Sequence, residues 1–204
     1  MSKGTDNQRG KAVPMDESSL LKLMEELGAL HRGHFLLSSG RHSHTYFQCA
    51  RLLMYPELAR ELGAALAVNF ADTPHDVVVS PALGGILIGH EVARAVGRRF
   101  IFTERKDSLM EMRRGFSLET REKVVIVEDV VTRGTSLLEV ARVVEDHGGV
   151  VVGLACIIDR TGGDVDLPLP LHTLARVAVE TWEPAECPLC RAGQPVIKPG
   201  SRGN

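Results

Sequence analysis

The chain has 204 residues, of which 44% are hydrophobic and 25% are charged, as in a globular protein with one main domain. Its 24 basic and 26 acidic residues give a formal net charge of −2, which argues against a protein that coats nucleic acid or anionic membranes. Its apolar runs are far shorter than the roughly 20 residues of a membrane span, its N-terminus lacks the apolar stretch of a secretory signal, and its four cysteines are too few for a disulfide framework. We therefore expect a cytoplasmic protein.

Three regions follow one another along the chain. Residues 1–14 are polar and mildly basic, and we expect them to form a disordered leader. Residues 15–183 contain the periodic segments of a folded domain. Residues 184–204 form a C-terminal extension, which from Gln194 onward mixes glycine and proline with short polar residues and is expected to be loosely held.

The first part of the domain predicts a helix, an extended segment and a second helix. Leucines at helical spacing mark residues 17–30, with Asp16 as the N-cap. Residues 31–49 indicate extended structure with a tight turn at Ser39-Gly40. Residues 56–70 are rich in alanine and leucine and are expected to be helical.

Further along the chain, short β-rich runs alternate with helical segments. This alternation predicts an α/β fold with a mostly parallel sheet flanked by helices. Ligands of such sheets bind beyond the carboxyl ends of the strands, where this sequence places polar or glycine-rich residues. We expect strands at 77–79, 100–103, 124–127 and 150–158, helices at 84–96 and 134–147, and polar strand ends at 80–85, 104–107, 128–136 and 159–161.

Residues 124–140 join a buried strand, two carboxylates and a helix that opens with Gly134-Thr135-Ser136. Backbone N–H groups at the helix start, with the hydroxyls there and on Thr132, make a cradle suited to a phosphate monoester. Glu128 and Asp129 would accept hydrogen bonds from hydroxyls, or hold a cation through water, so the pattern suits a ribose 5-phosphate. Response-regulator folds and metal hydrolases also place two acids after a strand, and Gly-Thr-Ser can be simple helix capping.

The segment E-D-V-V-T-R-G-T-S, residues 128–136, resembles the phosphoribosyl-pyrophosphate (PRPP) motif of the type I phosphoribosyltransferases. Four further segments resemble those of the orotate phosphoribosyltransferases in order and spacing. The resemblance covers about residues 17–182 and implies the family's sheet with a small N-terminal hood. The four segments are G-H-F-L-L-S-S-G-R-H-S-H-T-Y-F at 33–47, P-A-L-G-G-I-L-I-G at 81–89, F-T-E-R-K-D at 102–107 and I-I-D-R-T-G-G at 157–163.

This resemblance implies a homodimeric, Mg²⁺-dependent enzyme that joins PRPP to orotate, giving orotidine 5′-monophosphate and pyrophosphate in UMP biosynthesis. Mg²⁺ would bind mainly through PRPP and water, and no metal ligand is expected from the protein. A phosphoribosyltransferase for a purine or uracil is one alternative, which Arg160 and the hood segment disfavour. A PRPP-sensing regulator that binds nucleic acid is another, which the net charge of −2 disfavours. A purely structural role would leave the four polar strand ends unexplained.

The resemblance also assigns residues to PRPP. Glu128 and Asp129 would grip the ribose hydroxyls, and residues 132–136 would hold the 5-phosphate. Residues 82–84 resemble a loop whose backbone amides approach pyrophosphate, and Arg105-Lys106 suits the same polyanion unless it is only surface charge. The predicted PRPP contacts are Arg105, Lys106, Glu128, Asp129, Val130, Val131, Thr132, Arg133, Gly134, Thr135 and Ser136.

Orotate is expected to contact Thr132, Arg160, Tyr46 and Phe47. Arg160 follows the last predicted core strand, and an arginine can donate two parallel hydrogen bonds to the orotate carboxylate. The aromatic pair Tyr46-Phe47 would cover the base, although packing in the core is an equally good interpretation.

Residues 107–116 correspond to a family loop that is mobile, closes over PRPP and reaches the neighbouring subunit's site. Many members carry a lysine and a histidine in this loop, and this chain has neither. Arg113 and Arg114 are therefore the candidate catalytic cations, beside Glu128 and Asp129, for the leaving pyrophosphate. A guanidinium stays protonated near neutral pH, so it can supply charge but cannot act as the general acid.

Cys187 and Cys190, in E-C-P-L-C-R-A-G, have the spacing of a zinc knuckle, and this segment resembles the tail of one bacterial subgroup of the family. A tetrahedral zinc site needs two more ligands, which no neighbouring residue supplies. Four histidines lie within residues 31–44, but their spacing is irregular, and we expect them to hydrogen-bond within the hood rather than bind a metal.

Overall fold

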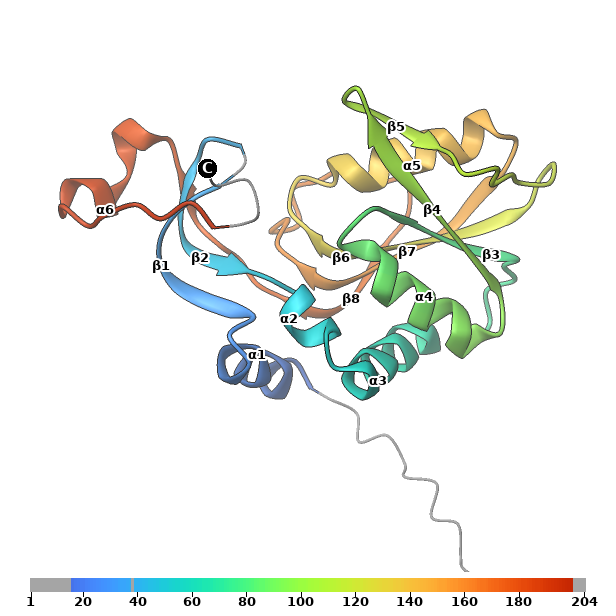
Figure 1. The fold of residues 1–204 in the computed structure, drawn as a ribbon, viewed down its shortest axis with the longest axis horizontal. Helices are drawn as coiled ribbons and strands as arrows, with labels where there is room; N and C mark the ends of the chain where they lie inside the picture. The colour runs from blue at the N-terminus through green and yellow to red at the C-terminus, as the bar shows by residue number, and fades with distance from the viewer. Residues whose placement is uncertain (1–15, 38, 200–204) are drawn as a thin grey trace, which may run out of the picture.

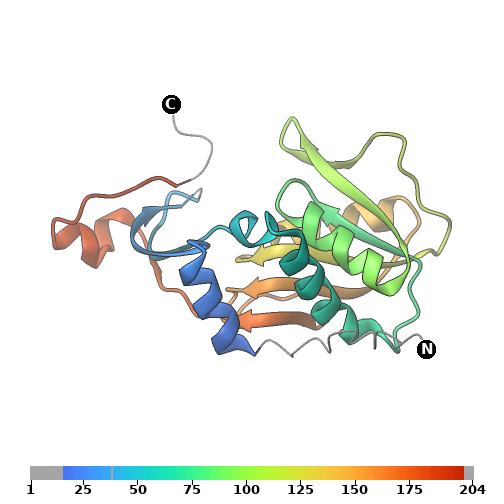
Figure 2. The same cartoon turned by 60° about the horizontal axis from the view of Figure 1, so that its bottom comes forward.

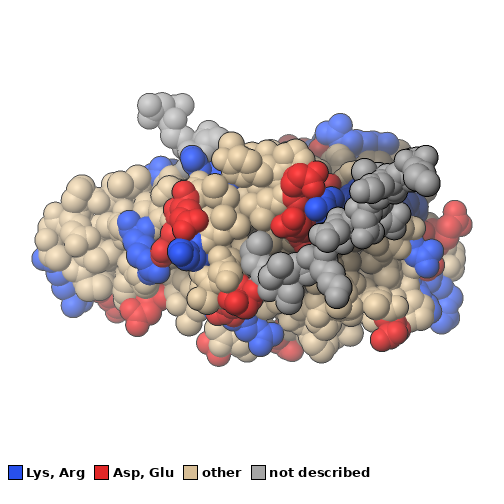
Figure 3. Space-filling model, turned by 90° about the horizontal axis from the view of Figure 1, so that it is seen from below, with Lys and Arg blue, Asp and Glu red and all other residues tan. Residues whose placement is uncertain are grey.

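The structure, a computed structural model, describes residues 16–37 and 39–199. The predicted leader of residues 1–14 lies outside the described residues. Figure 1 shows a sheet domain beside a smaller hood, which is built around the first two strands, and the C-terminal extension lies against this hood. No helix within the described residues is both long and apolar enough to cross a membrane. Acidic and basic side chains are interspersed on the face shown in Figure 3.

The main sheet has six strands in the order β5-β4-β3-β6-β7-β8. All neighbouring pairs are parallel except β4 and β5, which are antiparallel. This arrangement confirms the predicted α/β fold with a mostly parallel sheet. The strands are β3 (Val77–Pro81), β4 (Arg99–Lys106), β5 (Leu109–Met112), β6 (Lys123–Val131), β7 (Val150–Asp159) and β8 (Leu171–Arg176).

Helices cover both faces of this sheet (Figures 1 and 2). Alternate side chains of a strand point to opposite faces, so Val78 belongs to the core cluster that includes residues of α1, α3 and α4, while Val77 and Val79 belong to the cluster that includes α5. Both faces are therefore buried, which explains the nearly continuous valine runs of β3 and β6. The helices are α1 (Glu17–Glu26), α2 (Ala50–Leu53), α3 (Pro56–Ala67), η1 (Val68–Phe70), α4 (Gly85–Val96), α5 (Thr135–Asp146), η2 (Pro184–Glu186) and α6 (Pro188–Arg191).

The hood is a three-stranded antiparallel sheet in the order β1-β2-β9, with α6 beside it. The predicted tight turn joins β1 (Leu30–Leu36) to β2 (His42–Phe47): Gly40 has a φ of +81° and its N–H donates to the Leu37 carbonyl at 2.9 Å. β9 (Thr181–Trp182) pairs with the start of β2 and brings the C-terminal extension to the hood.

Several predicted boundaries were wrong. The first helix ends at Glu26 rather than residue 30, because Gly28 adopts a φ of +63°, which is incompatible with a continuing helix. The strand expected at 124–127 continues to Val131, so the two acids lie within it. Residues 107–116 are not loop throughout, since β5 pairs there with β4. The extension is held at Ile197, which exchanges hydrogen bonds of 2.8 and 2.9 Å with the backbone of β1.

Candidate active site at the carboxyl ends of the strands

The carboxyl end of β6 and the N-terminus of α5 enclose a small cavity of about 60 Å³. Gly134 precedes the helix with a φ of +69°, and a Cβ atom on it would lie 2.8 Å from Val165 Cγ1. Only glycine fits that combination of backbone angle and close packing. Free N–H groups at a helix start attract anions, so this cavity has the features of a phosphate cradle. It is lined by Glu128, Val130, Val131, Thr132, Gly134, Thr135, Ser136 and Leu137.

Glu128 and Asp129 lie side by side in sequence at the mouth of this cradle. Glu128 is buried, and its Oε1 accepts a hydrogen bond from Asp129 N at 3.0 Å. Burial, and then the neighbouring Asp129 charge, raise the pKa of the Glu128 carboxyl well above its usual value, and burial also raises the pKa of Asp129. None of the ion pairs among residues 16–37 and 39–199 includes either carboxylate, and partly desolvated carboxylates of this kind favour binding of hydroxyl donors or a divalent cation.

The loop after β3 presses against these carboxylates. A Cβ atom on Gly84 would lie 2.6 Å from Asp129 Oδ1, and one on Gly85 would lie 3.1 Å from Glu128 Oε1. The peptide between Ala82 and Leu83 in this loop is cis. Missing side chains at residues 84 and 85 therefore allow the backbone to approach the ends of two adjacent strands.

A larger pocket of about 680 Å³ lies between the hood and the sheet. It brings together all four residues predicted to contact orotate: Tyr46 and Phe47 from β2, Thr132 from the cradle, and Arg160 after β7. Burial and the charge of Asp129 raise the pKa of the Tyr46 hydroxyl, which is consistent with its position near the carboxylate pair. This pocket therefore extends from the cradle residue Thr132 to the aromatic side chains of Tyr46 and Phe47.

Arg160 is one of the cations that line this pocket. Its guanidinium carbon lies 5.2 Å from the centre of the Phe47 ring, and its buried Nε has no hydrogen-bond partner within the described part of the chain. Desolvation lowers the pKa of its guanidinium, and none of the ion pairs among the described residues includes Arg160. A desolvated guanidinium with free donors favours binding of a carboxylate ligand.

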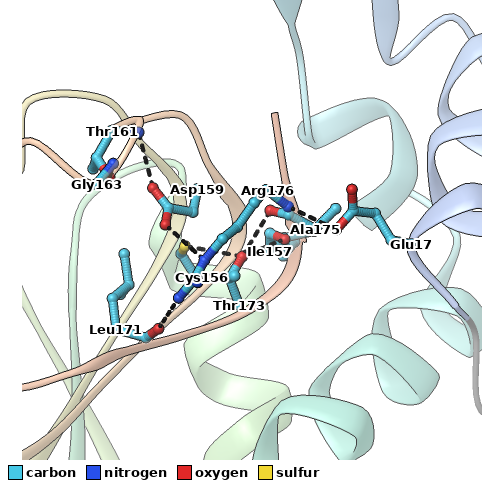
Figure 4. Close-up of polar contacts among 10 residues, drawn as sticks. All are labelled: Glu17, Cys156, Ile157, Asp159, Thr161, Gly163, Leu171, Thr173, Ala175 and Arg176. Atoms are coloured by element: carbon cyan, nitrogen blue, oxygen red, sulfur yellow. Dashed lines mark hydrogen bonds and ion pairs between the residues drawn. The ribbon is translucent and has the colours of Figure 1, made fainter. Parts of the chain in front are cut away.

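A polar network holds the backbone that carries Arg160 (Figure 4). The preceding residue, Asp159, accepts a hydrogen bond from Thr161 N at 2.8 Å and pairs with Arg176 Nε at 3.3 Å. The backbone N–H of Arg176 donates to Glu17 Oε2 at 3.1 Å, which ties β8 to α1. Asp159 is therefore a positioning residue, because it fixes the turn at the end of β7.

Three of the other predicted cations, Arg105, Arg113 and Arg114, form ion pairs within the protein. Arg105 forms an ion pair with Glu139 of α5 and donates to the Ser108 carbonyl at 3.1 Å. Arg113 and Arg114 pair with Glu104 at 3.3 and 2.9 Å. Lys106 and Arg133 are exposed, and Arg133 borders the large pocket. The structure thus brings together the carboxylates, the cradle residues and the residues predicted to bind orotate, but places the loop arginines outside the pocket.

Arg41 borders the same pocket and was not singled out from the sequence. Its guanidinium contacts Glu183 Oε1 at 2.5 Å, the Thr181 carbonyl at 2.7 Å and Thr181 Oγ1 at 3.0 Å. Its position just after the Ser39-Gly40 turn was the only available signal, since its partners are about 140 residues away in the chain. A second cavity, of about 700 Å³, lies under residues 161–171 and contains none of the predicted site residues.

Comparison with known proteins gives consistent results. Residues 52–167 match the model of the phosphoribosyl transferase domain. An orotate phosphoribosyltransferase of Caldicellulosiruptor bescii is 50% identical over 188 residues, covering 92% of this chain and 99% of that protein. The crystal structure of Mycobacterium tuberculosis H37Rv orotate phosphoribosyltransferase with inorganic phosphate aligns with a TM-score of 0.63 at 28% identity, covering 80% of this chain and 96% of that one. The same enzyme in complex with PRPP aligns with a TM-score of 0.55 at 26% identity, covering 65% of this chain and 81% of that one.

Proposed function

This chain belongs to the orotate phosphoribosyltransferase family, and we propose that its site transfers the ribose 5-phosphate group of PRPP to orotate. The products are orotidine 5′-monophosphate and pyrophosphate, and the reaction belongs to pyrimidine biosynthesis. The observation that carries this assignment is the half-buried guanidinium of Arg160, which has no partner for its Nε in the described structure and borders the same pocket as the cradle residue Thr132.

PRPP occupies the strand ends in this proposal. Its 5-phosphate lies in the cradle at the start of α5, and its ribose hydroxyls donate to Glu128 and Asp129. Its pyrophosphate meets the backbone of residues 82–84, where Gly84 permits close approach. The close approach of Gly84 to the Asp129 carboxylate supports binding of both ends of one ligand across β3 and β6.

Orotate lies under the hood in this proposal. Its carboxylate accepts hydrogen bonds from Arg160, and its ring lies against Phe47 and Tyr46, with Thr132 at the junction with the ribose. A purine or uracil lacks this carboxylate and would leave the desolvated guanidinium without a counter-charge. Base choice therefore depends on Arg160.

The reaction requires mainly positioning. The bond between C1 and the pyrophosphate oxygen breaks with its electron pair leaving on pyrophosphate, while orotate N1 forms the new bond to C1 and loses its proton to solvent. The cradle and Arg160 hold the two reactants in line for this exchange. Mg²⁺ would neutralise charge on pyrophosphate and take most of its ligands from PRPP and water, with Glu128 and Asp129 able to reach it through water.

Two further features belong to the proposal. We place the protein in the cytoplasm as a homodimer, and the four free cysteines fit a reducing compartment. In that dimer the segment 107–116 would close over the partner subunit's PRPP, with Arg113 and Arg114 exchanging Glu104 for pyrophosphate. In this proposal, the arrangement in which both arginines pair with Glu104 is the open position of the segment.

A direct assay tests the function. Orotate absorbance should fall when PRPP and Mg²⁺ are both added, with equimolar release of pyrophosphate. Uracil, adenine and hypoxanthine serve as comparison bases, and none of them should be consumed at a similar rate. Consumption of one of these bases in place of orotate would overturn the assignment while leaving the fold and the cradle intact.

A further inference from the structure

The hood contains a second cluster of chemically competent side chains, none of which lines the large pocket. His34 of β1 and His42 of β2 face Cys187 and Cys190 of the C-terminal extension, and one ligand atom from each lies within 4.8 Å of all the others. Three of the four residues are buried, and Cys190 is the exposed member. No step of the proposed transfer reaction uses any of these side chains.

The spacing of these atoms resembles that of tetrahedral zinc ligands. The sulfur-to-nitrogen distances are 3.4 Å from Cys187 Sγ to His34 Nε2, 3.3 Å from Cys190 Sγ to His42 Nδ1, and 3.7 Å from Cys190 Sγ to His34 Nε2. Tetrahedral zinc, with bonds of about 2.3 Å to sulfur and about 2.0 Å to nitrogen, separates such atoms by about 3.5 Å. The two ring nitrogens, at 2.8 Å, need to separate by about 0.5 Å to accept an ion between them.

The hydrogen bonding of the His34 ring also suits a metal ligand. Its Nδ1 lies 2.9 Å from the Gln194 carbonyl oxygen, which can only accept, so the ring proton lies on Nδ1. The lone pair of Nε2 is then directed toward the other three residues. Metal-binding histidines are commonly oriented in this way by a backbone carbonyl on the second ring nitrogen.

The two cysteines lie on a short turn typical of zinc knuckles. Cys187 precedes α6 and Cys190 lies within it, and the turn closes when Arg191 N donates to the Cys187 carbonyl at 3.2 Å. Gly193, with a φ of +68°, ends the turn, and its N–H donates to the Cys190 carbonyl at 2.9 Å. Both thiols therefore project from one compact turn toward the β1-β2 hairpin.

We propose that His34, His42, Cys187 and Cys190 bind one structural zinc ion that fastens the C-terminal extension to the hood. Two thiolates and two imidazoles are a donor set that favours Zn²⁺ over harder cations. All four positions are filled by protein, so the site is closed and has no place for a substrate.

The hood needs such a fastening because its extension buries little apolar surface. Neither η2 nor α6 contains a buried residue, and Cys187 is the one buried hydrophobic residue described after Ala175. Small units without a sufficient core are commonly stabilised by a structural metal. The large pocket is bordered by Leu36 and Arg41 of the hood and by Pro199 of the extension. The ion would therefore also fix the position of the hood residues on the proposed orotate side of the pocket.

Metal analysis of the full chain, purified without a histidine tag, tests the proposal first. About one zinc ion per chain should remain after exhaustive dialysis. Cys190→Ser and His42→Gln should each lower that content by at least about tenfold, because each removes one of four ligands. His31→Gln is the matched control, since His31 is an exposed histidine of the same hairpin and should keep full zinc content.

Cobalt exchange and thermal melting test the geometry and the structural role. Co²⁺ should give the intense visible bands of a tetrahedral site with a thiolate charge-transfer band, and Cys187→Ser should abolish that band. Chelation of zinc should lower the melting midpoint of the unmodified protein by several degrees, and re-addition of zinc should restore it. Protein that holds no metal, holds iron instead, contains a Cys187–Cys190 disulfide, or melts unchanged after chelation would overturn the proposal, whatever its activity with orotate.

Discussion

The carboxylate of Asp129 occupies the space that a side chain at Gly84 would need: an ideal Cβ on residue 84 would lie 2.6 Å from Oδ1 and 2.7 Å from Oδ2. These residues come from the ends of β3 and β6, which are neighbours in the sheet. The absence of one methyl group thus sets how closely the loop that we assign to pyrophosphate approaches the acids that we assign to ribose.

Gly84→Ala should lower kcat/KM by at least about tenfold, because the new methyl group must displace either the Asp129 carboxylate or the loop backbone. The protein should remain folded, since the loop is at the surface. Gly63→Ala is the control: its Cβ would lie 2.5 Å from Glu91 Cβ between α3 and α4, away from the site. That variant should lower the melting midpoint while the folded fraction keeps normal kcat/KM. Equal kinetics in both variants would remove the role assigned to Gly84.

Asp129→Asn should lower kcat more than about tenfold while circular dichroism shows a folded protein. The substitution keeps the shape of the side chain but removes the negative charge and one of the two oxygens that accept hydrogen bonds from the ribose hydroxyls. Asp129 is half-buried at a strand end and contributes little to the apolar core, so a loss of folding is not expected. Unchanged steady-state kinetics would contradict its assignment to ribose.

Glu128→Gln should raise the melting midpoint at about pH 8 while lowering activity. Burial raises the pKa of Glu128 in the folded state above its unfolded value, so ionisation of this group favours the unfolded chain. The stability it contributes is therefore present in acid and is lost as pH rises through the folded pKa. Melting curves across pH check this, and the variant should lose that part of the pH dependence. A variant less stable than the parent at about pH 8 would contradict it.

Arg160→Ala should raise the KM for orotate about thirty- to a hundredfold, with a much smaller effect on the KM for PRPP. A charge-assisted pair of hydrogen bonds contributes about 2–3 kcal/mol. Arg160→Lys should restore only part of the affinity, because an ammonium cannot form the same two parallel bonds. Equal changes in both KM values would mean that Arg160 does not bind the carboxylate.

The loop arginines have a test that separates the two subunits. Asp129→Asn and the double variant Arg113→Ala/Arg114→Ala should each be inactive alone. If the loop serves the partner's site, random subunit exchange should restore about a quarter of normal activity, because half the dimers are mixed and each has one intact site. A mixture that exchanges subunits, as native mass spectrometry can verify, but stays inactive would contradict action between subunits.

Local signals in the sequence were sufficient for the centre of the fold. The valine-rich strand, acid pair and Gly134-Thr135-Ser136 of the segment 124–140 are contiguous, so the strand β6 and the helix α5 could be predicted, while the binding of phosphate between them stays a prediction. The helix over residues 84–96 and the N-cap at Asp16 were also confirmed for this reason. Boundaries failed where a single backbone angle or strand pairing decided them, as at Gly28 and in β5.

Contacts between distant segments could not be predicted. His34 and Cys187 are 153 residues apart, and the extension returns to the hood through long-range contacts such as the pairing of β2 with β9 and the hydrogen bonds of Ile197 with β1. The ion pair between Arg105 and Glu139 likewise depends on how α5 packs beside β5, so an arginine that the sequence assigned to PRPP has a protein partner in the structure. The spacing of residues along the chain carries no information about such pairs.

If Arg160 selects the base, the ratio of kcat/KM for orotate to that for uracil depends on this side chain, since uracil lacks only the carboxylate. The unmodified protein should prefer orotate by about 10⁴-fold or more, as sites built around a polar ligand group do. Arg160→Ala should reduce this ratio at least about thirtyfold by lowering the orotate value while leaving the uracil value nearly unchanged. A ratio that is unaltered by the substitution, with both bases slowed equally, would mean that Arg160 does not select the base.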